Sequence, residues 1–263
     1  MIDLHCHLLP ALDDGPADLG GSLRLAHAQS VAGVRTVAVT PHATARFPTN
    51  PETVARGVVE MRHALAAAQI ALEVVGGAEV DLGWALELPD EELAGLTLDG
   101  GRWLLLEAPL TPTAPLEPGV AALRARGFEI LLAHPERSPM LQRDPAAVER
   151  LVRAGVRTQL TAGGLGGQFG RTVQRFALRL LDAGLVHTFA SDSHDVKRRP
   201  PGLRRPLEAA GLGDHVRLLC DEHPAELLAG GLLPQHVPLR RRRGLLGCSG
   251  RCCCRAHPAR PHG

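Results

Sequence analysis

Six short apolar runs, each followed at once by a side chain of a kind that binds metal ions, constrain this sequence more than any other feature. An apolar run of this length between turn residues is typical of a β-strand that is buried on both faces. In α/β barrels the functional side chains follow the carboxyl ends of such strands. We therefore predict a parallel α/β fold with a polar site at one edge. The runs are Ile2–His7, Thr36–His42, Leu72–Glu79, Arg102–Glu107, Glu129–Arg137 and Val186–His194.

Helical patterns alternate with these runs. Asn50 and Asp144 each precede a proline, which places a capping side chain ahead of a residue that favours the first helical position. With a further strand over Thr158–Thr161, about seven strands alternate with helices. This order predicts a parallel sheet with right-handed crossovers, and seven strands can close into a barrel. The apolar helix faces are Val54, Val58, Met61 and Leu65; Leu19, Leu23, Ala26 and Ser30; and Val173, Phe176, Ala177 and Leu180.

Composition divides the chain into a body, residues 1–231, and a tail, residues 232–263. The tail holds seven Arg and no acidic residue, whereas the body holds 22 basic and 28 acidic side chains. An acidic body with 3% aromatic residues and no Tyr gives no support to nucleic-acid binding. Four of the six Cys lie in the tail, which lacks periodicity and is expected to be disordered.

Two absences in the sequence set expectations about location. We find no apolar stretch near ~18 residues and no basic-then-apolar start, so we expect neither a membrane span nor a signal peptide. Two body cysteines argue against a disulfide framework. We therefore expect a cytoplasmic protein, and the sequence leaves its oligomeric state open.

The residues that follow the predicted strands form one chemical set. His5 and His7 are two apart on a strand, so their side chains leave the same face and can share a cation, while Cys6 points the other way. Alone, each member could be a capping, surface or core residue. Together the candidate ligands are five histidines and four carboxylates: His5, His7, Asp14, His42, Glu79, Glu107, His134, Asp192 and His194.

The ligand types indicate which ions could bind. Imidazole and carboxylate without thiolate suit Mn, Fe or Zn, and nine candidates exceed what one ion can take. We therefore predict two or three divalent ions bridged by a carboxylate such as Glu79, a centre suited to phosphoryl displacement. Arg137 and Arg199 follow His134 and His194 closely, and a guanidinium is a preferred bidentate partner of phosphate oxygens. We place Arg137, Arg199 and His42 in the catalytic set.

The motifs HCHLLPALDDGP, TPHAT, GAE, LLLEAP, AHPER and SDSHDVKRRPP resemble the PHP (polymerase and histidinol phosphatase) superfamily. They are most similar to its bacterial capsule-type protein-tyrosine phosphatases, from Met1 to about Gly231. The resemblance implies a distorted seven-stranded (β/α) barrel, a trinuclear and often manganese centre held by the nine candidates, and phosphate binding by Arg137 and Arg199. It also implies a phosphotyrosine protein as substrate, an autophosphorylating bacterial tyrosine kinase of capsule or exopolysaccharide production.

Alternatives remain beside that expectation. A small-molecule phosphatase of the histidinol-phosphate type would share the metal set, and a metal-binding regulator could dock on a kinase without turnover. Cys254 and Arg260 have the spacing of the phosphate loop in cysteine-dependent tyrosine phosphatases. That chemistry needs a thiolate held beneath a helix N-terminus, and the sequence around Cys254 predicts no such helix. We therefore set the cysteine mechanism aside.

Overall fold

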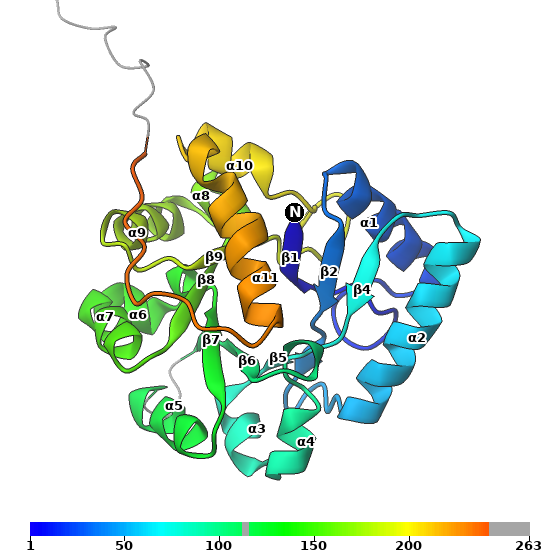
Figure 1. The fold of residues 1–263 in the computed structure, drawn as a ribbon, viewed down its shortest axis with the longest axis horizontal. Coiled ribbons are helices and arrows are strands. Elements are labelled where there is room, and N and C mark those ends of the chain that lie inside the picture. The colour runs from blue at the N-terminus through cyan, green and yellow to red at the C-terminus, as the bar shows by residue number, and fades with distance from the viewer. Residues whose placement is uncertain (112–115, 242–263) are drawn as a thin grey trace, which may run out of the picture.

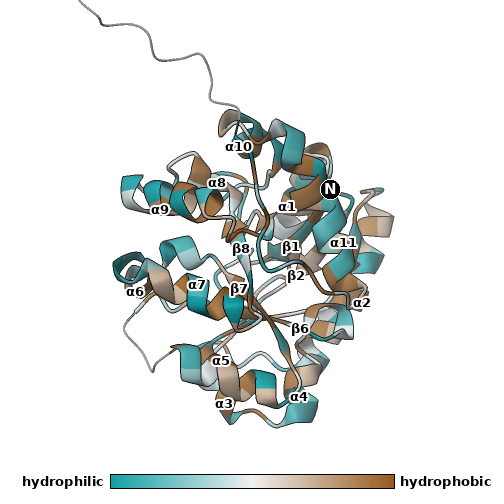
Figure 2. Ribbon diagram, turned by 60° about the vertical axis from the view of Figure 1, so that its left-hand side comes forward, coloured by the Kyte–Doolittle hydropathy of each residue, from teal (hydrophilic) through white to brown (hydrophobic). Residues whose placement is uncertain are grey.

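The computed structural model describes residues 1–111 and 116–241. Parallel strands form the centre and helices surround them, as Figure 1 shows. Hydrophobic ribbon is concentrated in the central strands, whereas the helices around them alternate between hydrophobic and hydrophilic positions (Figure 2). The strands are β1 (Ile2–Cys6), β2 (Thr36–Val39), β3 (His42–Ala43), β4 (Glu73–Val75), β5 (Glu79–Val80), β6 (Trp103–Glu107), β7 (Glu129–Ala133), β8 (Arg157–Thr161) and β9 (Thr188–Ala190).

Helices fill most of the connections between these strands. None of those in the described ranges is both long and apolar enough to span a bilayer. The helices are α1 (Leu19–Val31), α2 (Pro51–Ala67), α3 (Leu82–Glu87), α4 (Asp90–Ala94), α5 (Leu116–Ala125), α6 (Pro139–Arg143), α7 (Pro145–Arg153), α8 (Ala162–Leu165), α9 (Arg171–Asp182), α10 (Arg204–Ala209) and α11 (His223–Leu228).

The strand arrangement corrects the prediction of seven strands in a closed barrel. Among the described residues, nine strands form two sheets with the orders β1-β2-β4 and β3-β5-β6-β7-β8-β9. Two of the expected strands are each broken into two, because Thr40-Pro41 separates β2 from β3 and residues 76–78 separate β4 from β5. Proline has no N–H for the ladder, and glycine weakens a strand interior. A single bridge between Cys6 and Ser193 links the far edges.

An apolar core closes the amino ends of the strands. Trp103, at the start of β6, is buried, and its indole N–H donates to the carbonyl of Gly231. Leu227 of α11 and Leu233 pack in the same cluster as Trp103. Figure 1 shows α11 lying across this end. The carboxyl ends of the strands are therefore the end that is left for a site.

The predicted helix faces are correct with one exception. Val54, Val58, Met61 and Leu65 are buried in α2, as predicted. In α1, however, the buried residues are Ser22, Leu25, Ala26 and Gln29, and Leu19 is 46% exposed. The predicted α1 face is correct at Ala26 but misses Gln29, which enters a buried polar network that an apolar pattern cannot reveal.

The body also extends beyond the predicted boundary at Gly231. Leu233 and Val237 are buried, and the Arg157 guanidinium donates two hydrogen bonds to the carbonyl of Leu233. The backbone N–H of Val237 donates to the carbonyl of Gly184. Residues 232–241 thus belong to the folded body. The remainder of the predicted tail, with Cys254 and Arg260, lies outside the described residues.

Candidate metal centre

All nine candidate ligands gather at the carboxyl ends of the strands. His5 lies in β1, Glu107 ends β6, and His134 directly follows β7. The nine residues make up four overlapping groups, and within each group the ligand atoms lie within 4.8 Å of one another. The groups are His7, Asp14, His42 and His194; His5, His134 and Asp192; His5, His7 and Glu79; and His42, Glu79 and Glu107.

Irregular backbone aims several of these side chains. In β1, Asp3 pairs with Val37 but Cys6 pairs with Val39, so β1 contains one extra residue at this point. Bulges of this kind re-aim side chains next to functional sites. Cys6 accordingly packs in the apolar core, as predicted, while His5 and His7 reach the cluster. His134 and Asp192 have φ of 35° and 50°, left-handed values that cost free energy in residues other than glycine and concentrate at functional sites.

The centre of the cluster consists of two imidazoles and two carboxylates. The Nε2 atoms of His5 and His7 are 3.2 Å apart. Glu79 Oε2 lies 3.2 Å from His5 Nε2 and 3.4 Å from His7 Nε2. Asp192 Oδ1 lies 3.4 Å from both nitrogens. Glu79 also reaches outward, because its Oε1 is 2.5 Å from His134 Nε2 and its Oε2 is 3.1 Å from His42 Nδ1.

The Nδ1 atoms of His5 and His7 have partners that were not predicted from the sequence. His5 Nδ1 lies 3.1 Å from Gln159 Oε1, and His7 Nδ1 lies 2.6 Å from Asp13 Oδ2. These oxygens only accept, so both Nδ1 atoms donate, and in neutral rings both Nε2 atoms are left as acceptors. Two acceptor nitrogens then face each other and two carboxylate oxygens. This arrangement fits divalent cations, and the outer partners are of the kind that orient metal-binding histidines.

Ionisation at the centre reflects this crowding. Burial opposes ionisation of Glu79, but the neighbouring His5 and His134 hold the pKa of its carboxyl well below the ordinary value. Burial also opposes ionisation of Asp192, yet His5, His7 and Arg199 hold its pKa well below the usual range. Burial lowers the pKa of His134 to about 4. Burial and the charges of Glu79 and Asp81 raise the pKa of Glu107 to about 8.

A second group lies nearer to solvent. Asp14 Oδ1 is 3.1 Å from His194 Nε2 and 3.5 Å from His42 Nε2. The Asp14 side chain is 52% exposed and that of His42 is 16% exposed, whereas His194 is buried. Burial lowers the pKa values of both histidines, so both rings favour the neutral form that can bind a metal ion.

Both predicted arginines meet at Asp192. Arg137 Nη1 lies 2.5 Å from Asp192 Oδ2, and Arg199 Nη2 donates to the same oxygen. Arg199 Nη1 is also 2.7 Å from His194 Nε2. The two guanidinium groups therefore stand beside the metal-type ligands, where they could hold the oxygens of an anion.

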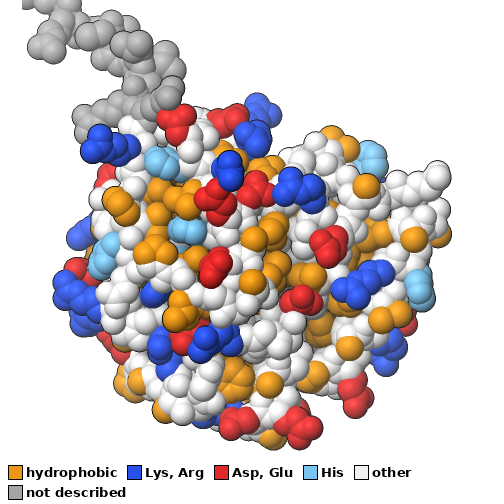
Figure 3. Space-filling view, viewed as in Figure 1, with side chains coloured by type: hydrophobic (Ala, Val, Ile, Leu, Met, Phe, Trp, Pro, Cys, Tyr) orange, Lys and Arg blue, Asp and Glu red, His pale blue; other side chains and the backbone are white. Residues whose placement is uncertain are grey.

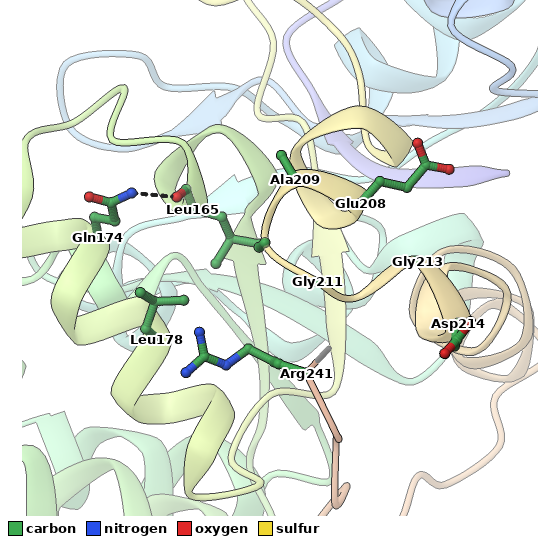
Figure 4. A pocket seen from close by; sticks show the side chains of 10 residues that line it. Leu165, Gln174, Leu178, Glu208, Ala209, Gly211, Gly213, Asp214 and Arg241 are labelled. Atoms are coloured by element: carbon green, nitrogen blue, oxygen red, sulfur yellow. Dashed lines mark hydrogen bonds between the residues drawn. The ribbon is translucent and has the colours of Figure 1, made fainter. Parts of the chain in front are cut away.

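Two of the cavities in the described part of the chain differ in their relation to the cluster. One of about 380 Å³ is lined by Asp14, His194 and Lys197, and so adjoins the cluster. A larger one of about 580 Å³ lies between α9 and α10, where Leu165, Leu178 and Arg241 line it (Figure 4), and it contains none of the nine candidates. On the face that carries α11, charged side chains of both signs are interspersed (Figure 3).

Fold and site together define a class: a barrel-like parallel α/β protein with a histidine and carboxylate cluster at its strand ends. A model of the family described as capsular polysaccharide synthesis, CpsB/CapC, matches residues 1–211. The chain belongs to this family.

Individual relatives agree with this assignment. The tyrosine-protein phosphatase YwqE of Bacillus subtilis is 34% identical over 201 residues, covering 76% of this chain and 79% of that protein. The tyrosine-protein phosphatase CpsB of Streptococcus pneumoniae is 28% identical over 217 residues, covering 79% and 88%. A chain from the crystal structures of these two proteins, described as unique metal-dependent tyrosine phosphatases, is 30% identical with a TM-score of 0.79 and covers 92% of this chain and 100% of its own length.

Proposed function

We propose that this chain is a metal-dependent phosphatase that hydrolyses phosphotyrosine in proteins. Its substrate would be an autophosphorylating bacterial tyrosine kinase of capsule or exopolysaccharide production, met in the cytoplasm. The observation that carries the proposal is the pair of Nε2 atoms of His5 and His7, which face each other and the carboxylates of Glu79 and Asp192. The family and the metal-dependent tyrosine phosphatases among its relatives support the reaction.

The nine clustered residues would hold two or three divalent ions, with Mn as the first candidate and Fe or Zn as the others. Bound ions would supply Lewis acidity, which lowers the pKa of water and neutralises charge on a phosphoryl group. Glu79 would bridge ions, because its two oxygens face four different histidines. Asp13 and Gln159 would fix the orientation of His7 and His5.

Arg137 and Arg199 would bind the phosphoryl oxygens. Both guanidinium groups are partly exposed beside the cluster, with exposed side-chain fractions of 16% and 23%. Their positive charge would stabilise the charge that spreads over these oxygens during displacement. The leaving group would need little help from a proton donor, because the phenol of tyrosine has a pKa of roughly 10. His42 would take part through the ion that it helps to hold, because burial favours the neutral form of its ring.

Product assays on metal-loaded protein test the proposal. Three substrates are compared: a phosphotyrosine peptide, histidinol phosphate and a generic aryl phosphate. We expect the phosphotyrosine peptide to give the highest kcat/KM. Preference for histidinol phosphate would replace the proposal with a small-molecule phosphatase. Metal binding without turnover of any of the three would favour a regulatory protein instead.

A further inference from the structure

Only part of the cluster reaches solvent, and this part defines where a substrate enters. His5, His7, Glu79, His134, Asp192 and His194 are buried. Three cluster members and the two neighbouring arginines are at least partly exposed: Asp14, His42, Glu107, Arg137 and Arg199. A phosphate ester must therefore approach past these side chains, and the group attached to the phosphate must rest against whatever adjoins them.

Two of these entrance residues are in contact with a phenylalanine. The rings of His42 and Phe47 are stacked, with centroids 5.9 Å apart and planes inclined by 13°. The guanidinium carbon of Arg137 lies 4.6 Å from the centroid of the Phe169 ring. Phe47 and Phe169 come from different connections, one between β3 and α2 and the other between α8 and α9.

The exposure of these two rings is unusual for this chain. The sequence has five Phe, two Trp and no Tyr, and all seven aromatic residues are among those described. Four of them, Trp103, Phe128, Phe176 and Phe189, are buried in the core. Three are half-buried, and two of these three, Phe47 and Phe169, stand at the entrance to the cluster. Core packing therefore accounts for most aromatic residues but not for these two.

Local hydrogen bonds order the segments that carry both rings. Thr44 Oγ1 accepts from the backbone N–H groups of Arg46 and Phe47, and the Thr44 N–H donates to the Phe47 carbonyl. On the other side, the Gln168 amide donates to the carbonyl of Arg198. This bond ties the segment of Phe169 to the segment that carries Arg199. These bonds order the two segments that carry Phe47 and Phe169.

Resting on the proposed function, we propose that Phe47 and Phe169 contact the phenyl ring of phosphotyrosine and make the site select aryl over alkyl phosphates. In phosphotyrosine one oxygen joins ring and phosphorus, so the ring must lie close to the groups that hold the phosphate. Phe169 contacts Arg137, which is one of those groups, and Phe47 contacts the proposed metal ligand His42. Aromatic rings attract each other at centroid separations of about 4.5–7 Å, a contact that a short alkyl group cannot make.

Binding of two non-hydrolysable anions, phenylphosphonate and methylphosphonate, tests this inference without turnover. Metal-loaded wild type, Phe47→Leu, Phe169→Leu and the double variant are titrated by calorimetry. Leucine keeps an apolar side chain of similar size and removes the ring. Phe128→Leu is the matched control, because the Arg126 guanidinium carbon lies 5.8 Å from the Phe128 ring centroid. Phe128 itself precedes β7 and so lies at the amino ends of the strands, away from the cluster.

We expect wild type to prefer phenylphosphonate and the double variant to lose about tenfold of that preference. Phe128→Leu should keep the wild-type preference. An unchanged preference in the double variant, or equal weakening of both anions, overturns the inference, because a merely structural role for the rings affects both anions alike. If wild type hydrolyses no phosphate ester, the proposed function itself fails. If wild type hydrolyses phenyl phosphate yet shows no preference between the phosphonates, only the aromatic contact is refuted.

Discussion

The segment after β9 contributes alternate residues to two buried polar clusters. Asp192 and His194 belong to the candidate metal centre. Ser191 and Ser193 belong to a hydrogen-bonded network with Asp3 and Gln29. The two clusters also share β1, because Asp3 enters the network and His5 enters the centre. Both clusters consist of buried polar side chains, yet the partners that surround a buried carboxylate differ between them.

Asp3 and Asp192 make the contrast explicit. Asp3 accepts hydrogen bonds on both oxygens, from the N–H groups of His5 and Ser191 and from the side chains of Gln29 and Ser191. These donors are neutral, and burial raises the pKa of Asp3. Asp192 instead faces two arginines through Oδ2, while its buried Oδ1 accepts no hydrogen bond. A buried carboxylate closed by neutral donors is structural, whereas one with an open oxygen beside imidazoles is suited to bind a cation.

Metal removal should show the largest difference between the two clusters, because only the candidate metal centre would lose a bound ion. We expect exhaustive chelation to abolish phosphatase activity and to lower Tm, because the ligands lose the cation that their geometry requires. Mn²⁺ should restore activity more fully than Mg²⁺. The metal content, the turnover of an aryl phosphate and the Tm from thermal denaturation are measured before and after chelation. Undiminished activity in protein shown to be metal-free would refute the proposed role of the centre.

Two substitutions within the centre should distinguish phosphate binding from metal binding. Arg137→Ala should leave the metal content unchanged and lower kcat/KM by about 10²-fold or more, the scale for removing one charge-stabilising donor. His134→Ala should lower both, because it removes a proposed ligand. The two variants are compared by metal analysis and kinetics. Near-normal turnover of Arg137→Ala would mean that Arg137 does not bind the phosphate.

Residues at the ends of apolar strands could be predicted from the sequence, whereas residues that are buried by polar contacts could not. Each of the nine clustered residues lies at or just beyond an apolar strand, apart from Asp14 in its loop, and parallel strands bring such positions together. Gln159 was missed because it lies inside β8, and Asp13 because a loop pattern cannot separate it from Asp14. The break of β2 and β3 at Pro41 could have been read from the sequence, because proline cannot donate to the ladder. The buried face of α1 could not, because Gln29 is buried by polar contacts.

A substitution in the hydrogen-bonded network should affect stability and leave catalysis nearly intact. Gln29→Leu removes a buried amide that donates to Asp3, Ser191 and Ser193, so we expect the free energy of unfolding to fall by about 1–3 kcal/mol. Turnover per bound metal should stay within about threefold. Urea unfolding measures the free energy of unfolding, and steady-state kinetics measure the turnover. Ser22→Ala is the control, since Ser22 is buried on the same helix and its Oγ has no hydrogen-bond partner. A loss of turnover as large as that expected for Arg137→Ala would show that the two clusters are not separable.

His187 extends the comparison to pH. The Thr158 N–H donates to His187 Nδ1, and His187 Nε2 donates to the Gln235 carbonyl, so the ring is held in one neutral form. Burial and the charge of Arg157 lower its pKa to about 3. The unfolded chain takes up this proton below about pH 6.5 while the folded chain does not, so stability is lost as pH falls from that value toward 3.

We expect the titration of His187 to lower the free energy of unfolding by on the order of 2 kcal/mol when the pH falls from 7 to 5. Urea unfolding at both pH values, in wild type and in His187→Asn, isolates its contribution from those of the other titrating groups. The variant should show the smaller difference between the two pH values. An equal difference in both proteins would mean that His187 accepts a proton in the folded state.

Removing residues 242–263 should give the smallest effect, and comparison with a shorter chain that ends at Gly231 locates the end of the folded body. The sequence of residues 242–263 has no apolar periodicity, so we expect that removing them keeps turnover of a small aryl phosphate within about threefold, a change in barrier of under ~1 kcal/mol. Cutting at Gly231 instead also removes the buried Leu233 and Val237 and leaves the Arg157 guanidinium without the Leu233 carbonyl. That shorter chain should lose stability first and activity only as it unfolds, which denaturation and kinetics at matched temperature can separate. A collapse of activity in a folded chain that ends at Arg241 would show that Cys254 or Arg260 takes part in the reaction after all.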